Sequence, residues 1–162
     1  MRAYHILFLC THNSARSILG EALASTHPSG KLVGHSAGST PGGKVNPFAH
    51  ELAVDMGYPT DQLRSKSWDE FAGNDAVAMD FIITVCDNAA GEVCPVWPGH
   101  PATAHWGFPD PSQVEGNDEQ KRTAFRAVML GLQRRIDLLA ALPLEKLDPM
   151  SLQTELRKLS TL

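Results

Sequence analysis

The chain has 162 residues and a formal net charge of −4. This length fits one domain with a substantial core, and the acidic balance gives no basic face of the kind that binds nucleic acid. No apolar run approaches the length of a membrane span, and none resembles an export signal, so we expect a cytoplasmic protein without a membrane anchor. The three cysteines in such a chain favour reactive thiols over permanent disulfides.

The first apolar run covers residues 5–9 and is typical of a buried strand, and Cys10 follows it directly. After Arg16 the apolar residues recur at helical spacing. We therefore expect a strand, a loop and a helix, with backbone N–H groups of the loop and the amino end of the helix surrounding an oxyanion. The predicted oxyanion-binding residues are Thr11, His12, Asn13, Ser14, Ala15, Arg16 and Ser17.

The spacing of Cys10 and Arg16 indicates a nucleophilic site. A thiol at the amino end of a helix and beside a guanidinium has a lowered pKa, so it acts as a thiolate. The planar guanidinium of Arg16 can hold two oxygens of a tetrahedral anion, and Ser17 can donate its hydroxyl to the thiolate. Each residue alone would be an ordinary strand-end cysteine or surface arginine, but together they predict nucleophilic attack on a bound oxyanion.

The rest of the chain alternates strands and helices. Strands are predicted over residues 31–38, 81–85 and 102–108, and helices after the Asn46-Pro47 pair, over 67–71 and over 118–142. The last of these helices has a buried face formed by Phe125, Val128, Leu132, Ile136 and Leu139. This order predicts an α/β fold, a small four-stranded parallel sheet flanked by helices on both faces. We expect one domain over residues 1–143 and a C-terminal tail over 144–162 that can form a last helix.

Polar groups that follow the strands are candidates for the site, because binding groups gather at the carboxyl ends of parallel strands. Cys10, Cys86 and Asp110 follow the first, third and fourth predicted strands, so we expect them to converge. Asp110 lies between two prolines on a stiff turn, where a carboxylic acid could protonate a leaving oxygen. A solvated turn aspartate is the alternative interpretation of Asp110.

Cys86 and Cys94 lie in a long stretch rich in glycine and proline, residues 86–101, with seven residues between them. Long loops in compact domains usually have a function, and these two thiols can form a bridge if the loop folds back. Such a pair suits disulfide exchange. Zinc bound by the two cysteines with His100 and His105 is the alternative, but the gap between the cysteines is wider than in most structural zinc sites, so we predict no metal.

Three features together resemble the arsenate reductases built on the low-molecular-weight tyrosine phosphatase fold. They are the loop Cys10 to Ser17, the pair Cys86 and Cys94, and the stretch of residues 105–111, HWGFPDP. The resemblance covers residues 4 to 142 and implies the fold of that family. It also implies an enzyme that reduces arsenate to arsenite. The catalytic residues that we predict are Cys10, Arg16, Cys86, Cys94 and Asp110.

The resemblance further implies a thiol relay from Cys10 to Cys86 to Cys94, with re-reduction of the final disulfide by thioredoxin. Glutathione with glutaredoxin stays open as the reductant. Arsenate is the expected substrate, phosphate or sulfate are its mimics, and no tightly bound cofactor is expected.

This sequence departs from the family pattern at several positions. His12 stands where the family often has glycine, which places a side chain at a tight point of the loop. Some relatives bind potassium beside the loop through residues matching Asn13, Glu21 and Ser36 together with an acid. Lys66 stands where we place that acid, so we expect its ammonium to replace the ion. Ser112 stands where many tyrosine phosphatases have a tyrosine.

Two other functions remain open from the sequence. The alternative enzyme is a low-molecular-weight phosphatase that hydrolyses phosphotyrosine or other phosphomonoesters through a Cys10 phosphoenzyme, which needs only Cys10, Arg16 and Asp110. The non-enzymatic alternative is a redox-sensing or zinc-stabilised binding module that uses the Cys86 loop.

Overall fold

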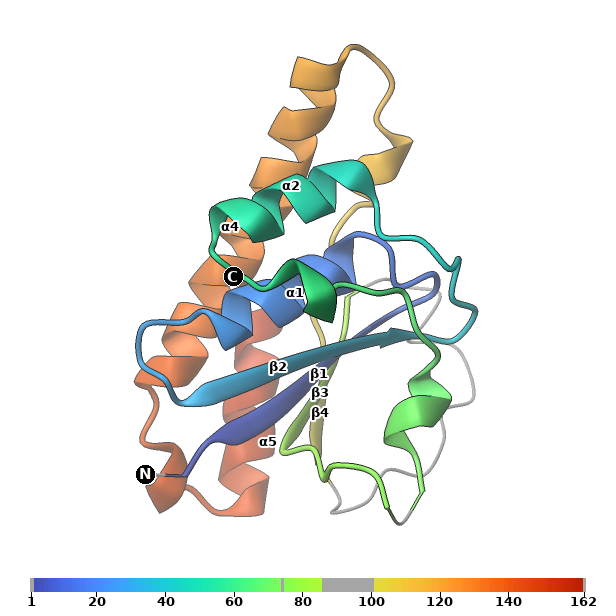
Figure 1. The fold of residues 1–162 in the computed structure, drawn as a ribbon. Coiled ribbons are helices and arrows are strands. Elements are labelled where there is room, and N and C mark those ends of the chain that lie inside the picture. Colours follow the sequence, from blue (N-terminus) through green and yellow to red (C-terminus); the bar gives the residue numbers. More distant parts are fainter. Residues whose placement is uncertain (1, 74, 86–100, 162) are drawn as a thin grey trace.

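The computed structural model describes residues 2–73, 75–85 and 101–161. Its sheet contains four parallel strands in the order β2-β1-β3-β4. The strands are β1 (Tyr4–Cys10), β2 (Leu32–Gly38), β3 (Phe81–Thr84) and β4 (Ala102–His105). β1 pairs with β2 along its whole length, so Cys10 lies beside Gly38 at the carboxyl ends of the two strands. The predicted α/β fold with a four-stranded parallel sheet is confirmed (Figure 1).

In the described part of the chain, four α-helices accompany the sheet: α1 (Arg16–Ser25), α2 (Pro47–Asp55), α4 (Asp118–Ala141) and α5 (Pro149–Lys158). Local signals explain where they begin. Asn46 caps α2 by accepting a hydrogen bond from the Phe48 N–H at 2.9 Å, and Asn117 forms a capping box with Gln120 at the start of α4. The described residues also form short 3₁₀ helices: η1 (Thr60–Gln62), η2 (Trp68–Phe71), η3 (Pro111–Gln113), η4 (Leu144–Lys146) and η5 (Leu159–Thr161).

The two faces of the sheet pack against different elements. On one face, β1 and β3 contribute residues such as Phe8 and Ile83 to a core shared with α1, α2, α4 and α5. The predicted apolar face of α4 is buried in this core. On the other face, Leu7, Leu9 and Ile82 pack with Trp68 and Phe71 of η2. Helical segments therefore cover both faces, with the α-helices concentrated on one of them.

Residues 144–161 pack on the sheet. Leu156 of α5 is fully buried, and its carbonyl oxygen accepts a hydrogen bond from the Trp106 indole at 3.2 Å. Gln153 pairs with both backbone groups of Thr103 in the edge strand β4, which satisfies edge groups that would otherwise be open to another strand. Within the described residues, no helix combines the length and apolar character needed to cross a membrane.

Candidate active site

The loop between β1 and α1 is held in shape by Asn13. This residue is fully buried and has a φ of 50°, and no other non-glycine residue in the described part of the chain has a positive φ. Its side-chain amide donates to Ser17 Oγ at 2.8 Å, and its side-chain oxygen accepts from the Lys66 N–H at 2.9 Å. Asparagine tolerates the left-handed conformation better than most residues, and here two side-chain hydrogen bonds hold it there.

Carbonyl oxygens of the loop are bound by the segment that follows β2. The Thr11 oxygen accepts from the Thr40 N–H at 2.9 Å, and the Ser14 oxygen accepts from the Asn46 N–H at 2.8 Å. The His12 oxygen accepts from the Gly42 N–H at 3.0 Å and from Ser65 Oγ at 2.9 Å. These hydrogen bonds hold the loop in one shape, and a loop of this kind can direct its N–H groups at an anion.

His12 fits the loop because its side chain is exposed and its φ lies outside the left-handed region. The turn that would favour glycine falls on Asn13 instead. The glycine that this geometry does require is Gly38, at the end of β2. A Cβ atom there would lie 2.6 Å from the Thr11 oxygen and 3.0 Å from the Asn13 nitrogen. Gly38 was not predicted as a site residue, since only the close approach of the loop backbone shows why glycine is needed there.

Arg16 is the first residue of α1 and reaches across to the segment after β4. Its Nη1 donates to the Phe108 carbonyl oxygen at 2.8 Å, and its Nη2 lies 3.6 Å from Asp110 Oδ2. Its Nε is buried and has no hydrogen-bond partner among the described residues. Nε and Nη2 form one edge of the planar guanidinium, so Phe108 occupies the opposite side and leaves a two-donor edge for an oxyanion.

The amino end of α1 is also open to an anion. Among the residues that the structure describes, no side chain caps this end, and the first turn carries no acidic residue. The helix dipole and the first N–H groups therefore favour negative charge at this point. Cys10, the last residue of β1, is buried at the same end of the sheet.

Asp110 caps η3, and its Oδ1 accepts hydrogen bonds from the Ser112 N–H at 2.9 Å and from Ser112 Oγ at 2.6 Å. Burial raises the pKa of Asp110, but the Ser112 hydrogen bonds and the charge of Arg16 outweigh it and hold that pKa below its ordinary value. Asp110 is therefore a carboxylate at neutral pH in the ligand-free protein. An anion bound beside it would raise its pKa, because a like charge favours the protonated form.

A buried charge cluster lies behind the loop. Lys66 Nζ is 3.4 Å from Glu21 Oε1, 3.3 Å from Ser36 Oγ and 2.9 Å from the Arg64 carbonyl oxygen. Glu21 also accepts hydrogen bonds from Ser36 Oγ at 2.6 Å and from the Tyr58 hydroxyl. Burial lowers the pKa of Lys66, and the carboxylate of Glu21 opposes that effect. These residues do not fit a potassium ion, because the ammonium group already lies among the oxygens. Tyr58 was not predicted from the sequence to take part in this cluster.

The structure brings Arg16 and Asp110 together and places Cys10 and the loop residues 11–17 at the carboxyl end of β1. Cys86, Cys94 and His100 lie outside the described residues, so their part in the site stays a prediction. His105 lies in β4, where its Nδ1 is 2.8 Å from Thr84 Oγ1.

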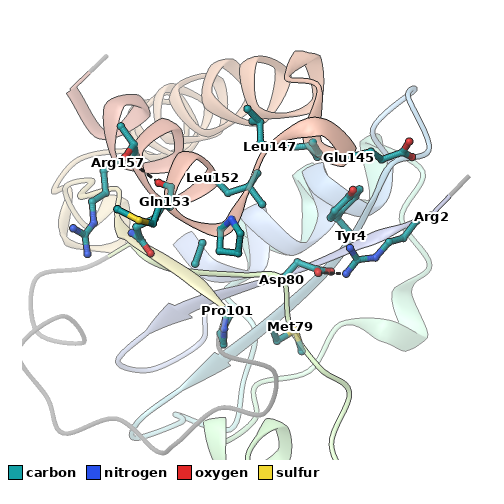
Figure 2. Close-up of a pocket in the computed structure, with 15 residues that line it drawn as sticks. Arg2, Tyr4, Met79, Asp80, Pro101, Glu145, Leu147, Leu152, Gln153 and Arg157 are labelled. Atoms are coloured by element: carbon teal, nitrogen blue, oxygen red, sulfur yellow. Dashed lines mark hydrogen bonds and ion pairs between the residues drawn. The ribbon is translucent and has the colours of Figure 1, made fainter.

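A cavity of about 670 Å³ opens at the opposite end of the strands, between their amino ends and the η4–α5 segment (Figure 2). Tyr4 and Asp80 border it on the sheet side, and Gln153 and Arg157 border it on α5. Figure 2 shows Arg2 directed at Asp80, the ion pair on one wall of the cavity. None of the predicted site residues lines this cavity, so it is separate from the candidate active site.

Comparisons with known proteins place this geometry in a family. The family model described as low molecular weight phosphotyrosine protein phosphatase matches residues 5–153. An arsenate reductase from Halalkalibacterium halodurans is 36% identical over 135 residues, which cover 83% of this chain and 94% of that protein.

Two solved structures share the fold. The arsenate reductase from Archaeoglobus fulgidus has a TM-score of 0.61 and 26% identity, covering 85% of this chain and 99% of the other. The thioredoxin-dependent arsenate reductase from Corynebacterium glutamicum has a TM-score of 0.55 and 26% identity, covering 85% of this chain and 63% of the other. The chain belongs to the low molecular weight phosphotyrosine protein phosphatase family, and the relatives named here within that fold are arsenate reductases.

Proposed function

We propose that this protein is an arsenate reductase that converts arsenate to arsenite through a relay of its three cysteines. The observation that carries the proposal is the guanidinium edge of Arg16, with Nε unpartnered among the described residues, beside an anion loop that begins at Cys10. The arsenate reductases at 36% and 26% identity support the substrate. Arsenate has the shape and charge of phosphate, so the same loop suits both anions.

In the first step, arsenate binds between the loop N–H groups and the Nε and Nη2 atoms of Arg16. The Cys10 thiolate attacks arsenic and forms a sulfur–arsenic bond. Asp110, protonated once the anion lies beside it, donates its proton to the departing oxygen, which leaves as water. The loop amides and Arg16 stabilise the negative charge on the remaining oxygens in the transition state.

In the second step, the Cys86 thiol attacks the Cys10 sulfur and forms a disulfide. The electron pair of the sulfur–arsenic bond passes to arsenic, which is reduced from the +5 to the +3 state and leaves as arsenite. Cys94 then attacks Cys86, which releases the Cys10 thiolate and leaves a Cys86–Cys94 disulfide. The cysteines carry both electrons, so the reaction needs no tightly bound cofactor.

The final disulfide must be reduced by an external dithiol, and we propose thioredoxin in the cytoplasm. The thioredoxin-dependent relative from Corynebacterium glutamicum supports this reductant. A protein dithiol reduces a protein disulfide by forming its own disulfide, so electrons balance without another donor. Glutaredoxin with glutathione is the competing system and forms a second arm of the test.

The test is arsenate-dependent NADPH oxidation with thioredoxin and thioredoxin reductase, run beside the glutathione and glutaredoxin system. We expect turnover with thioredoxin and its loss in Cys86→Ser and in Cys94→Ser. Hydrolysis of p-nitrophenyl phosphate by the same samples needs only the Cys10 loop and Asp110, so it should survive both substitutions. Ester hydrolysis without any arsenate reduction by the wild type would assign the protein to the phosphatases instead.

A further inference from the structure

Gly131 stands in the middle of α4, where glycine is unfavourable relative to alanine. A Cβ atom at this position would lie 2.6 Å from Cε1 and 3.4 Å from Cζ of the Phe108 ring. The ring therefore packs directly against the backbone of α4. The missing side chain of Gly131 makes this contact possible.

The Phe108 ring is also contacted by Arg135, one helical turn after Gly131. The Arg135 Cζ atom lies 4.7 Å from the ring centroid, a cation–π arrangement. This arginine is buried, with 8% of its surface exposed. Its Nε donates to the Leu159 carbonyl oxygen at 3.0 Å and its Nη1 donates to the Gly131 carbonyl oxygen at 3.1 Å. The guanidinium is thus fixed against α4 and η5.

The backbone of Phe108 is fixed as well. Its N–H donates to the Val85 carbonyl oxygen at 3.2 Å, and its own carbonyl oxygen accepts from Arg16 Nη1 at 2.8 Å. The Phe108 carbonyl oxygen therefore holds one side of the Arg16 guanidinium in place and leaves the Nε and Nη2 edge for the oxyanion. A displaced carbonyl would let the guanidinium rotate and lose the two-donor arrangement.

We infer that Phe108 is a positioning residue for Arg16. Gly131 and Arg135 form the surface of α4 that holds the Phe108 ring in place. The inference rests on the proposed function in one respect, namely that the Nε and Nη2 atoms of Arg16 bind the oxyanion. It adds that the affinity for a tetrahedral oxyanion depends on Gly131 and Arg135 of α4, which act through Phe108 and Arg16.

The test compares Gly131→Ala with Leu130→Ala, a neighbouring substitution on α4 at a residue that is 55% exposed. We expect Gly131→Ala to raise the Kd for inorganic phosphate about tenfold, since one charge-assisted hydrogen bond is misplaced. The KM for arsenate should rise more than kcat falls. In ligand-free protein, the pKa of Asp110, followed by carbon NMR, should rise because Arg16 has moved away. Leu130→Ala should leave all of these values unchanged.

Two further comparisons separate the specific contact with the Phe108 ring from a general loss of packing. Arg135→Met should weaken phosphate binding, whereas Arg134→Met, which removes the same charge from the exposed neighbour, should not. In a Phe108→Leu background, which lacks the Cε1 and Cζ atoms, adding Gly131→Ala should cause little further loss of affinity. The Arg135 and Arg134 pair decides the question by itself if Gly131→Ala fails to fold.

The outcomes distinguish this inference from the proposed function. Phosphate affinity and the Asp110 pKa are measured without turnover, so a wild type that reduces no arsenate contradicts the proposed function alone. The inference is overturned if Gly131→Ala and Leu130→Ala have equal phosphate affinity and equal Asp110 pKa. It is likewise overturned if Arg135→Met and Arg134→Met agree in both values. Neither result would contradict the proposed function.

Discussion

Arg16 Nη2 lies 3.6 Å from Asp110 Oδ2, so the residue that would hold the oxyanion also stabilises the ionised form of the predicted acid. The two roles are coupled by charge. When an anion binds Nε and Nη2 of Arg16, the Asp110 carboxylate loses part of the stabilisation that Arg16 provides and gains a negatively charged neighbour. Both changes raise the pKa of Asp110. Binding of the substrate thereby favours the protonated acid that the first chemical step requires.

Asp110→Asn should lower kcat for arsenate about 100-fold or more, because asparagine cannot donate a proton to the departing oxygen. Phosphate should bind the variant at least as tightly as the wild type, since a negative charge beside the anion is gone. Wild type should take up more protons than the variant when phosphate binds, because only the wild type can protonate Asp110. Calorimetry in buffers of different ionisation enthalpy measures this uptake. Unchanged kcat in Asp110→Asn would remove this residue from the mechanism.

Gly38→Ala should disrupt the anion loop. The added Cβ would lie 2.6 Å from the Thr11 oxygen, a backbone atom that cannot move without shifting the loop. Overpacking of this kind costs about 1–3 kcal/mol, and we expect a weaker affinity for phosphate together with lower stability. Gly42→Ala is the control, because its nearest contact would be His12 Cβ at an ordinary 4.0 Å. Both variants are titrated with phosphate. Equal Kd values for Gly38→Ala and Gly42→Ala would show that the loop does not depend on Gly38.

Lys66→Met should lower the free energy of unfolding by about 3–5 kcal/mol, because the Glu21 carboxylate would stay buried without its cation. The double variant Lys66→Met with Glu21→Gln should recover much of that loss. Lys44→Met, at an exposed lysine, is the control for removal of charge. Urea unfolding in potassium and in sodium chloride should give the same stability for the wild type. Selective stabilisation by potassium would contradict the replacement of the ion by Lys66.

His35 should make the protein less stable as the pH falls from 6.5 to about 4. Burial, followed by the charges of His5 and Lys66, lowers the pKa of His35 from 6.5 to about 4. Its Nε2 lies 2.9 Å from His5 Nδ1. Between these two pH values the unfolded chain binds a proton that the folded protein does not, so stability decreases with falling pH.

His35→Gln should therefore flatten the pH dependence of unfolding in this window, whereas His50→Gln, at an exposed position on α2, should leave it unchanged. Denaturant unfolding at several pH values provides the comparison. The same slope in wild type and His35→Gln would mean that His35 does not titrate as described.

The elements that the sequence predicted correctly are those specified by local chemistry. The apolar run before Cys10, the caps at Asn46 and Asn117, and the apolar stripe of α4 each act within a few residues of their own position. The predicted strand over residues 102–108 is shorter in the structure and ends at His105. Beyond His105 the chain turns, and the Phe108 carbonyl oxygen accepts a hydrogen bond from Arg16. Local sequence patterns do not predict such a tertiary contact.

The parts of the site that the sequence could not reveal depend on contacts between distant segments. Gly38 matters because a loop carbonyl approaches it, and Tyr58 joins the cluster because α2 brings it to Glu21. Gly131 looks like an unfavourable helix residue until the Phe108 ring is placed against it. The Cys86 and Cys94 relay was predicted from the resemblance and stays a prediction.

The cysteine relay is tested most directly by a single turnover without an external reductant. Fully reduced protein is mixed with excess arsenate, the arsenite released per chain is counted, and the disulfide is mapped by mass spectrometry. We predict one arsenite per chain and a Cys86–Cys94 disulfide in the wild type, one arsenite with a Cys10–Cys86 disulfide in Cys94→Ser, and none in Cys86→Ser. Arsenite formation by Cys86→Ser, or none by the wild type, would contradict the relay.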